Sequence, residues 1–87
     1  MKELFALTLL RLVNLQFSTT KGMNPNYIGL VNDAGNTIYL SIESDCVNIC
    51  AFKVSKQCFN KSINDIDQLE DVIDQLKLKV KCTDNII

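Results

Sequence analysis

Apolar residues recur at three- and four-residue spacing near the end of the chain, between Ser62 and Lys81. This spacing places them along one side of a helix, so the segment predicts an amphipathic α-helix. Ser62 followed by Asp65 resembles a capping pair at its start. The apolar stripe consists of Ile66, Leu69, Ile73, Leu76 and Val80.

The opposite side of the same predicted helix carries four carboxylates: Asp67, Glu70, Asp71 and Asp74. Their spacing points them away from the apolar stripe. Closely spaced negative charge can dock on a basic groove of a partner protein, including a groove that normally holds nucleic acid. The same four residues also fit a solvated helix face, because early acids and late lysines complement the helix dipole. They are the candidate partner-binding residues of the sequence.

The first segment, from Lys2 to about Val13, is rich in leucine and lacks Gly and Pro, which predicts a helix. Its apolar residues cover more of the circumference than one buried stripe requires. We therefore expect it to be covered on two sides, one of which could be a second subunit. From Val13 onward apolar and polar residues alternate, which predicts a strand at about 14–20, although the helix could instead continue to Phe17.

Two further strands are predicted in the middle of the chain, at Tyr27–Val31 and Thr37–Glu43, after a loop over Lys21–Asn26. The turn between them, over 32–36, contains Gly35, which can adopt a positive φ. Apolar and polar residues alternate in the second strand, so one face of the sheet should be apolar and the other wetter.

The last predicted strand spans Cys46–Val54, and Ser55–Lys61 is expected to lead into the final helix. Eighty-seven residues support one core, so residues 1–87 are predicted to form a single domain. The predicted class is α+β, with a small antiparallel sheet of three to four strands and the element order α-β-β-β-β-α. The final helix should pack on the sheet face that carries Ile38, Leu40 and Ile42.

The composition, with 47% hydrophobic and 22% charged residues, is typical of a globular protein. A net charge of −1 provides no general attraction to nucleic acid, so direct nucleic-acid binding is not expected. Basic and aromatic residues do meet in one stretch, a combination that can bind single strands but that also fits core aromatics beside solvated lysines. These residues are Phe52, Lys53, Lys56, Phe59 and Lys61.

The four cysteines are Cys46, Cys50, Cys58 and Cys82. The chain has no His, and the cysteine spacing lacks the C-x2-C pair of common zinc sites. Cys46 and Cys50 on one strand would lie more than ~12 Å apart, too far for a disulfide or a shared metal. We expect buried reduced thiols with no metal and no cofactor, and a cysteine-dependent metal or redox protein remains an alternative.

The leucine-rich start of the chain does not predict export or a membrane span. Glu3 and Arg11 interrupt it, no A-x-A-like cleavage site follows, and a bilayer requires about 20 apolar residues. We therefore expect a cytoplasmic protein. Without His, a Gly-rich phosphate loop or a nucleophile motif, the sequence does not predict an enzyme.

The chain resembles small phage and prophage proteins, among them some anti-CRISPR inhibitors. The resemblance is carried by the alternating segment Val13–Thr20, the hairpin LVNDAGNTIYLSIES from Leu30 to Ser44, and the acidic final helix. It implies a non-enzymatic inhibitor of a host defence or nucleic-acid-handling protein, acting through the acidic helix face or a sheet edge. The alternative is a structural homo-oligomer, such as a homodimer, assembled through the leucine-rich N-terminal helix.

Overall fold

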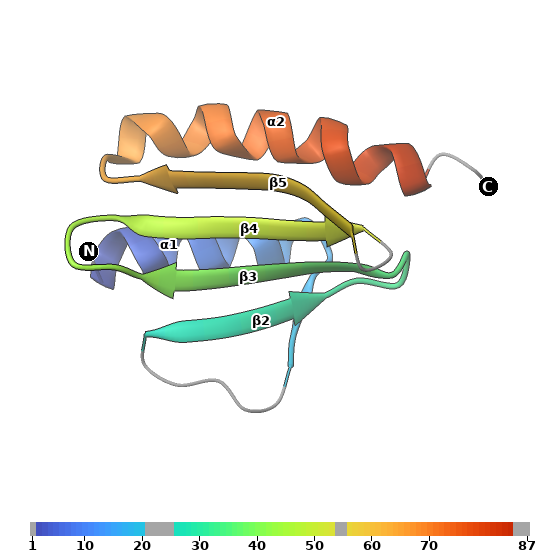
Figure 1. Ribbon diagram of the computed structural model, residues 1–87, viewed down its shortest axis with the longest axis horizontal. Coiled ribbons are helices and arrows are strands. Elements are labelled where there is room, and N and C mark those ends of the chain that lie inside the picture. The colour runs from blue at the N-terminus through green and yellow to red at the C-terminus, as the bar shows by residue number, and fades with distance from the viewer. Residues whose placement is uncertain (1, 21–25, 54–55, 85–87) are drawn as a thin grey trace.

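Five antiparallel strands form one sheet in which each strand pairs with the next one along the chain (Figure 1). The computed structural model describes residues 2–20, 26–53 and 56–84, with side chains in the last helix up to residue 79. The predicted α+β class, antiparallel sheet and two flanking helices are confirmed. The elements are α1 (Lys2–Asn14), β1 (Ser18–Thr19), β2 (Tyr27–Val31), β3 (Asn36–Ile42), β4 (Val47–Lys53), β5 (Lys56–Ile63) and α2 (Ile66–Asp84).

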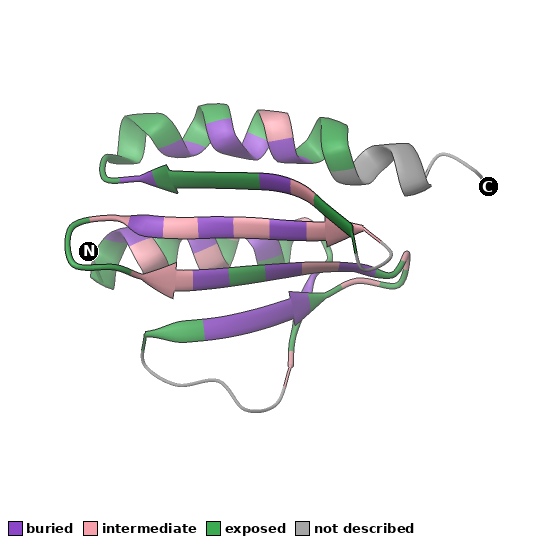
Figure 2. Cartoon of the chain, viewed as in Figure 1, coloured by how far each residue is buried: buried purple, intermediate pink, exposed green. Residues whose placement is uncertain are grey.

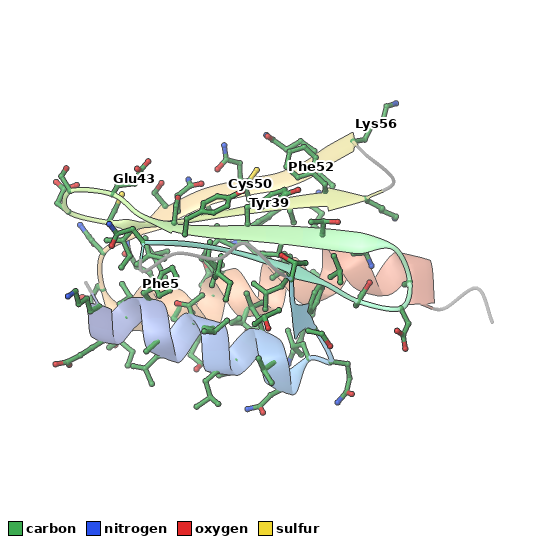
Figure 3. All side chains as sticks on the ribbon, turned by 90° about the horizontal axis from the view of Figure 1, so that it is seen from below. Phe5, Tyr39, Glu43, Cys50, Phe52 and Lys56 are labelled. Atoms are coloured by element: carbon green, nitrogen blue, oxygen red, sulfur yellow. The ribbon has the colours of Figure 1, made fainter. Side chains whose placement is uncertain are left out.

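Both helices lie on the same face of the sheet, α1 against β3 and α2 along β5 (Figures 1 and 3). The hydrophobic core fills the space between this face and the helices (Figure 2). No helix covers the other face within the described part of the chain, so the fold has two layers. The core residues are Leu4, Leu12, Phe17, Ile28, Leu30, Ile38, Leu40, Val47, Ile49, Ala51, Phe59, Ile63, Leu69, Val72, Ile73 and Leu76.

The alternation predicted for the strand that became β3 is confirmed. Ile38 and Leu40 of β3 are fully buried, whereas Tyr39 between them is exposed on the open face. The turn that enters β3 also forms as predicted, with Gly35 at φ 87°. The Asn32 side chain holds this turn by accepting the backbone N–H groups of Ala34 and Asn36.

Strand β5 was not predicted, and it raises the strand number to five. Its buried side chains are Phe59 and Ile63. Lys61 lies between them and is exposed at the edge of the sheet, so the buried residues are four positions apart and not two. An edge strand tolerates such a break in the apolar alternation, since one side of it faces water. The period-two signal was therefore too weak to identify this strand from the sequence.

The predicted start of the final helix at Ser62 is wrong, because that residue lies in β5 and the helix begins at Ile66. Asp65 is the capping residue, and its carboxylate accepts the N–H of Asp67 at 3.2 Å. Gln68 completes a capping box by accepting the N–H groups of Asn64 and Asp65 at 2.8 and 3.2 Å. The predicted capping pair of Ser62 and Asp65 is thus replaced by Asp65 and Gln68, in which Asp65 is the first residue.

The apolar stripe of α2 differs from the prediction at its first residue and near its middle. Leu69, Ile73 and Leu76 are buried as expected, but Ile66 is 54% exposed and Val72 is buried instead. The side chain of Val80 lies outside the described side chains. As predicted, α2 packs on the face of the sheet that carries Ile38 and Leu40. On that face it follows β5, whereas α1 lies over β3.

The predicted strand over 14–20 is mostly a helix end, since only Ser18–Thr19 pair with β2. Helix α1 closes with a Schellman motif: the N–H of Phe17 bonds to the carbonyl of Leu12, and the N–H of Gln16 bonds to the carbonyl of Val13. Phe17 and Leu12 are both buried, as this motif favours. Gln16 has φ 74°, a left-handed conformation that glycine usually supplies.

Among the residues that the structure describes, two polar side chains are fully buried in the core. The hydroxyl of Thr8 donates a 2.7 Å hydrogen bond to the Leu4 carbonyl one turn earlier. The side-chain amide of Asn36 forms no hydrogen bond among the described residues. An unpaired buried amide costs about 1–3 kcal/mol, so Asn36 is a weak point of the core.

We predict that Gln16→Gly stabilises the fold by about 0.5–1 kcal/mol, because glycine removes the left-handed strain at this helix end. Urea denaturation monitored by circular dichroism measures the change. Gln16→Ala is the matched control: it removes the side chain but keeps Cβ, so no comparable gain is expected. Equal stability of the glycine and alanine variants would contradict the strain at this position.

Candidate partner-binding surfaces

All four candidate carboxylates of α2, Asp67, Glu70, Asp71 and Asp74, are exposed on the outer side of the helix. Two of them have partners within the chain. Glu70 forms a two-pronged ion pair with Arg11 of α1, in which Nη1 and Nη2 donate to separate carboxylate oxygens. The carboxylate of Asp71 accepts a 2.9 Å hydrogen bond from the side-chain amide of Gln75, one turn later.

The Arg11–Glu70 pair joins the two helices, and its electrostatics are reciprocal. The hydrogen bond from Arg11 lowers the pKa of the Glu70 carboxyl, and the same bond raises the pKa of the guanidinium. Asp74 also attracts the guanidinium through space. Arg11, the only arginine in the chain, offsets the negative charge at the edge of the acidic face next to α1 through this pair.

An apolar stripe runs along the outer side of α1, which the two-layer fold leaves uncovered. Leu7, Leu10 and Val13 are 39%, 56% and 44% exposed, and their three-residue spacing places them on one side of the helix. Leu7 also lines a pocket between the starts of the helices, together with the exposed Ile66 of α2. The expectation that α1 is covered on two sides is thus not met within one chain.

A row of three aromatic rings crosses the open face of the sheet on three neighbouring strands. Tyr27 of β2 stacks on Tyr39 of β3 with centroids 5.8 Å apart. Tyr39 meets Phe52 of β4 edge to face at 5.7 Å (Figure 3). The two tyrosines remain 40% and 37% exposed, so the row is accessible.

Gly29 of β2 lies directly opposite Tyr39 and allows its ring to lie close to the sheet. A Cβ at position 29 would lie 3.0 Å from Oγ1 of Thr20 and 3.4 Å from the Tyr39 ring. The Thr20 hydroxyl is held in place by a 3.1 Å hydrogen bond to the Gly29 carbonyl. Glycine at this position therefore orients the central ring of the row.

The cysteines in the described part of the chain, Cys46, Cys50 and Cys58, are free thiols. Burial raises the pKa of the Cys50 thiol, and the nearby Cys58 adds to this effect. The Cys50 sulfur lies 3.3 Å from the Gln57 side-chain oxygen. No metal-binding group of three or more acidic or cysteine residues forms among the described residues, and the side chain of Cys82 lies outside them.

The edges of the sheet are poor templates for an added strand. β1 has only two residues, and β5 carries two exposed lysines, Lys56 and Lys61. The β4–β5 pairing also contains a register shift at Ala51 and Phe52. Short edges, lysines and bulges all oppose pairing with another chain. The described edges of the sheet therefore offer little for pairing with a strand of another chain.

The chain has no significant match among protein-family models, curated proteins or solved structures. Neither helix, within the residues that the structure describes, is long and apolar enough to cross a membrane.

The aromatic row was missed by sequence reasoning. Its residues, Tyr27, Tyr39 and Phe52, are more than ten positions apart in the chain, and only the strand register brings them together. A signal did exist, because each of them occupies the polar side of an alternating strand. Aromatic residues at such outward positions indicate a surface cluster on the sheet.

We predict that the Arg11–Glu70 pair stabilises the fold above the ordinary pKa of glutamate, about pH 4–5. Arg11 lowers the folded-state pKa of Glu70, so this stabilisation is lost as the pH falls through that lowered value. The measurement is the urea midpoint of the wild type and of Glu70→Gln over a pH series from neutral to acidic. The two should differ at neutral pH and converge in acid, whereas a difference that stays constant with pH would refute the assignment.

We predict that Gly29→Ala destabilises the fold by about 1–3 kcal/mol, because its Cβ crowds Thr20 and Tyr39. Thermal unfolding of the single variants and of the pair Thr20→Ala/Gly29→Ala measures the effect. The penalty of the alanine should be smaller when the Thr20 hydroxyl is absent. An unchanged penalty in that background would show that the hydroxyl contact is not the cause.

Proposed function

We propose that this protein is a small non-enzymatic protein-binding module that uses the outer surface of its two helices. The observation that carries the proposal is the position of the apolar stripe of α1 beside the acidic face of α2, joined by Arg11 and Glu70. Apolar contact supplies affinity at about 25 cal/mol per Å² buried, and the carboxylates supply orientation and fast association. The proposed partner therefore has a basic and partly apolar surface.

The resemblance to small phage and prophage inhibitors supports a host protein as the partner. In this proposal the chain acts in the cytoplasm of the host cell and blocks a defence or nucleic-acid-handling protein. Such proteins hold phosphate chains in basic grooves, and an acidic helix can occupy the same groove. The chain would then compete with nucleic acid without binding it.

A second candidate function is a structural homo-oligomer assembled through α1. The exposed stripe of Leu7, Leu10 and Val13 supports it, because contiguous apolar surface on a small protein commonly marks an interface. The two candidates share this stripe but differ in their need for charge. Only the partner-binding function requires the carboxylates of α2.

We predict that Asp67→Lys/Asp71→Lys weakens partner binding on the order of tenfold or more, because it places like charges against a basic surface. Affinity capture from a host-cell extract with quantitative mass spectrometry identifies the partner, and titration of that purified partner measures the loss. Binding by the wild type should also weaken as the salt concentration rises.

The matched control is Asp33→Lys/Asp45→Lys, which changes the net charge equally but alters loops of the sheet. It should retain partner binding, and circular dichroism checks that both variants fold. Equal affinity of the wild type and the α2 variant would reject the acidic face. Loss of a wild-type oligomer on Leu10→Glu, with no partner captured, would support the structural alternative.

A further inference from the structure

The open face of the sheet is arranged around one residue. Tyr39 is the middle residue of β3, and β3 is the middle strand of the five. On β2, Tyr27 and Val31 lie two residues to either side of Gly29, which pairs with Tyr39. Both are about as exposed as Tyr39, at 40% and 39%. The apolar part of this face is thus centred on Tyr39.

The two ends of the same face carry opposite charges. Glu43 and Asp45 lie at the end where β3 turns into β4. Lys56 lies at the other end, at the start of β5 next to the β2–β3 turn that contributes Asp33, whereas Lys53 of β4 alternates onto the helix-facing side with Ala51. Figure 3 shows Glu43 and Lys56 at opposite ends on the open side. The face therefore carries the carboxylates of Glu43 and Asp45 at one end and the ammonium group of Lys56 at the other.

We infer that this face is the interface of a symmetric homodimer, in which the open sheets of two copies pack together. A two-fold axis through Tyr39, at right angles to the strands, exchanges the two ends of the face. It places the acidic end of each copy opposite the basic end of the other. It also sets Tyr39 on Tyr39 of the second copy, and Tyr27 opposite Val31 of the second copy. Aligned sheets pack in this way, with a rotation of about 30° between strand directions.

The polar side chains on this face can be covered because they already bond to one another. The Asn48 amide donates to the Asn60 side-chain oxygen and to the Ser62 hydroxyl, both at 3.0 Å. The Cys50 thiol is paired with Gln57. Such groups need not lose their hydrogen bonds when water leaves, which avoids the main cost of burying them.

The size of the face also suits a dimer. The molecule measures 38 × 28 × 22 Å, and the sheet lies across its shortest axis (Figure 1). A standard interface buries about 800 Å² per partner, and a face of this extent can supply that area. Each copy would bury its aromatic row at the centre and keep its charged ends at the rim, the usual anatomy of an interface.

Aromatic rows on sheets also bind single-stranded nucleic acid, which requires a basic surface that follows the backbone. Here one end carries Glu43 and Asp45, and the whole chain has a net charge of −1. The charges match a second copy better than a phosphate chain. Dimerisation would leave both helical layers facing outward, so each dimer would present two copies of the helix surface.

The test uses charge exchange at the rim of the interface. Glu43→Lys and Lys56→Glu each place like charges against each other across the two-fold axis. Each single variant should dimerise at least about tenfold more weakly than the wild type in sedimentation equilibrium at low salt. A one-to-one mixture of the two should form a heterodimer, identified by native mass spectrometry. Restoration by mixing is specific to a two-fold contact between these two residues.

A second variant and a matched control complete the experiment. Tyr27→Glu introduces charge into the apolar centre and should abolish the dimer while the circular dichroism spectrum is retained. Leu10→Glu places the same charge on α1 and should leave the dimer intact. Cys50, which lies beside Tyr39, should be alkylated more slowly in the dimer than in the Tyr27→Glu monomer.

Three results would overturn the inference. One is a wild-type chain that stays monomeric at the highest concentration. Another is a dimer that survives the rim variants and Tyr27→Glu, or that is lost in Leu10→Glu. The third is a monomer that binds a labelled single-stranded oligonucleotide and loses this binding in Tyr27→Glu. Capture of a partner through α2 is measured separately, so its failure is distinguishable from failure of the dimer.

Discussion

One hydrophobic core, enclosed between a single face of the sheet and two helices, determines the rest of this structure. Burial of that face contributes most of the favourable free energy of so short a chain. Two helices suffice to cover it, and they leave the opposite face of the sheet and the outer sides of the helices in water. The surfaces available for binding are therefore a consequence of how the core closes.

Local capping motifs determine where α1 ends and where α2 begins on that core. The Schellman motif at Gln16 stops α1 and turns the chain so that Phe17 enters the core. The capping box of Asp65 and Gln68 starts α2 immediately after β5. With both helices on the same face, Arg11 reaches Glu70, and one surface combines an apolar stripe with negative charge.

The two exposed surfaces differ in chemical character, and this difference separates their proposed roles. The helix surface has one dominant sign of charge, which suits a basic partner of another kind. The open sheet face has an acidic end, a basic end and an aromatic centre at Tyr39, which suits a copy of itself. A chain with both surfaces could dimerise and bind a partner without competition between the two.

The sequence by itself determined the α+β class, the hairpin around Gly35, the buried side of β3, and the exposure of Asp67, Glu70, Asp71 and Asp74. Those features depend on periodicity and turn chemistry, which are local. Only the tertiary structure decided that Lys56–Ile63 is an edge strand, that Ile66 is exposed, and that Glu70 is paired. It also brought Tyr27, Tyr39 and Phe52 together, because strand register and helix placement depend on contacts between residues far apart in the chain.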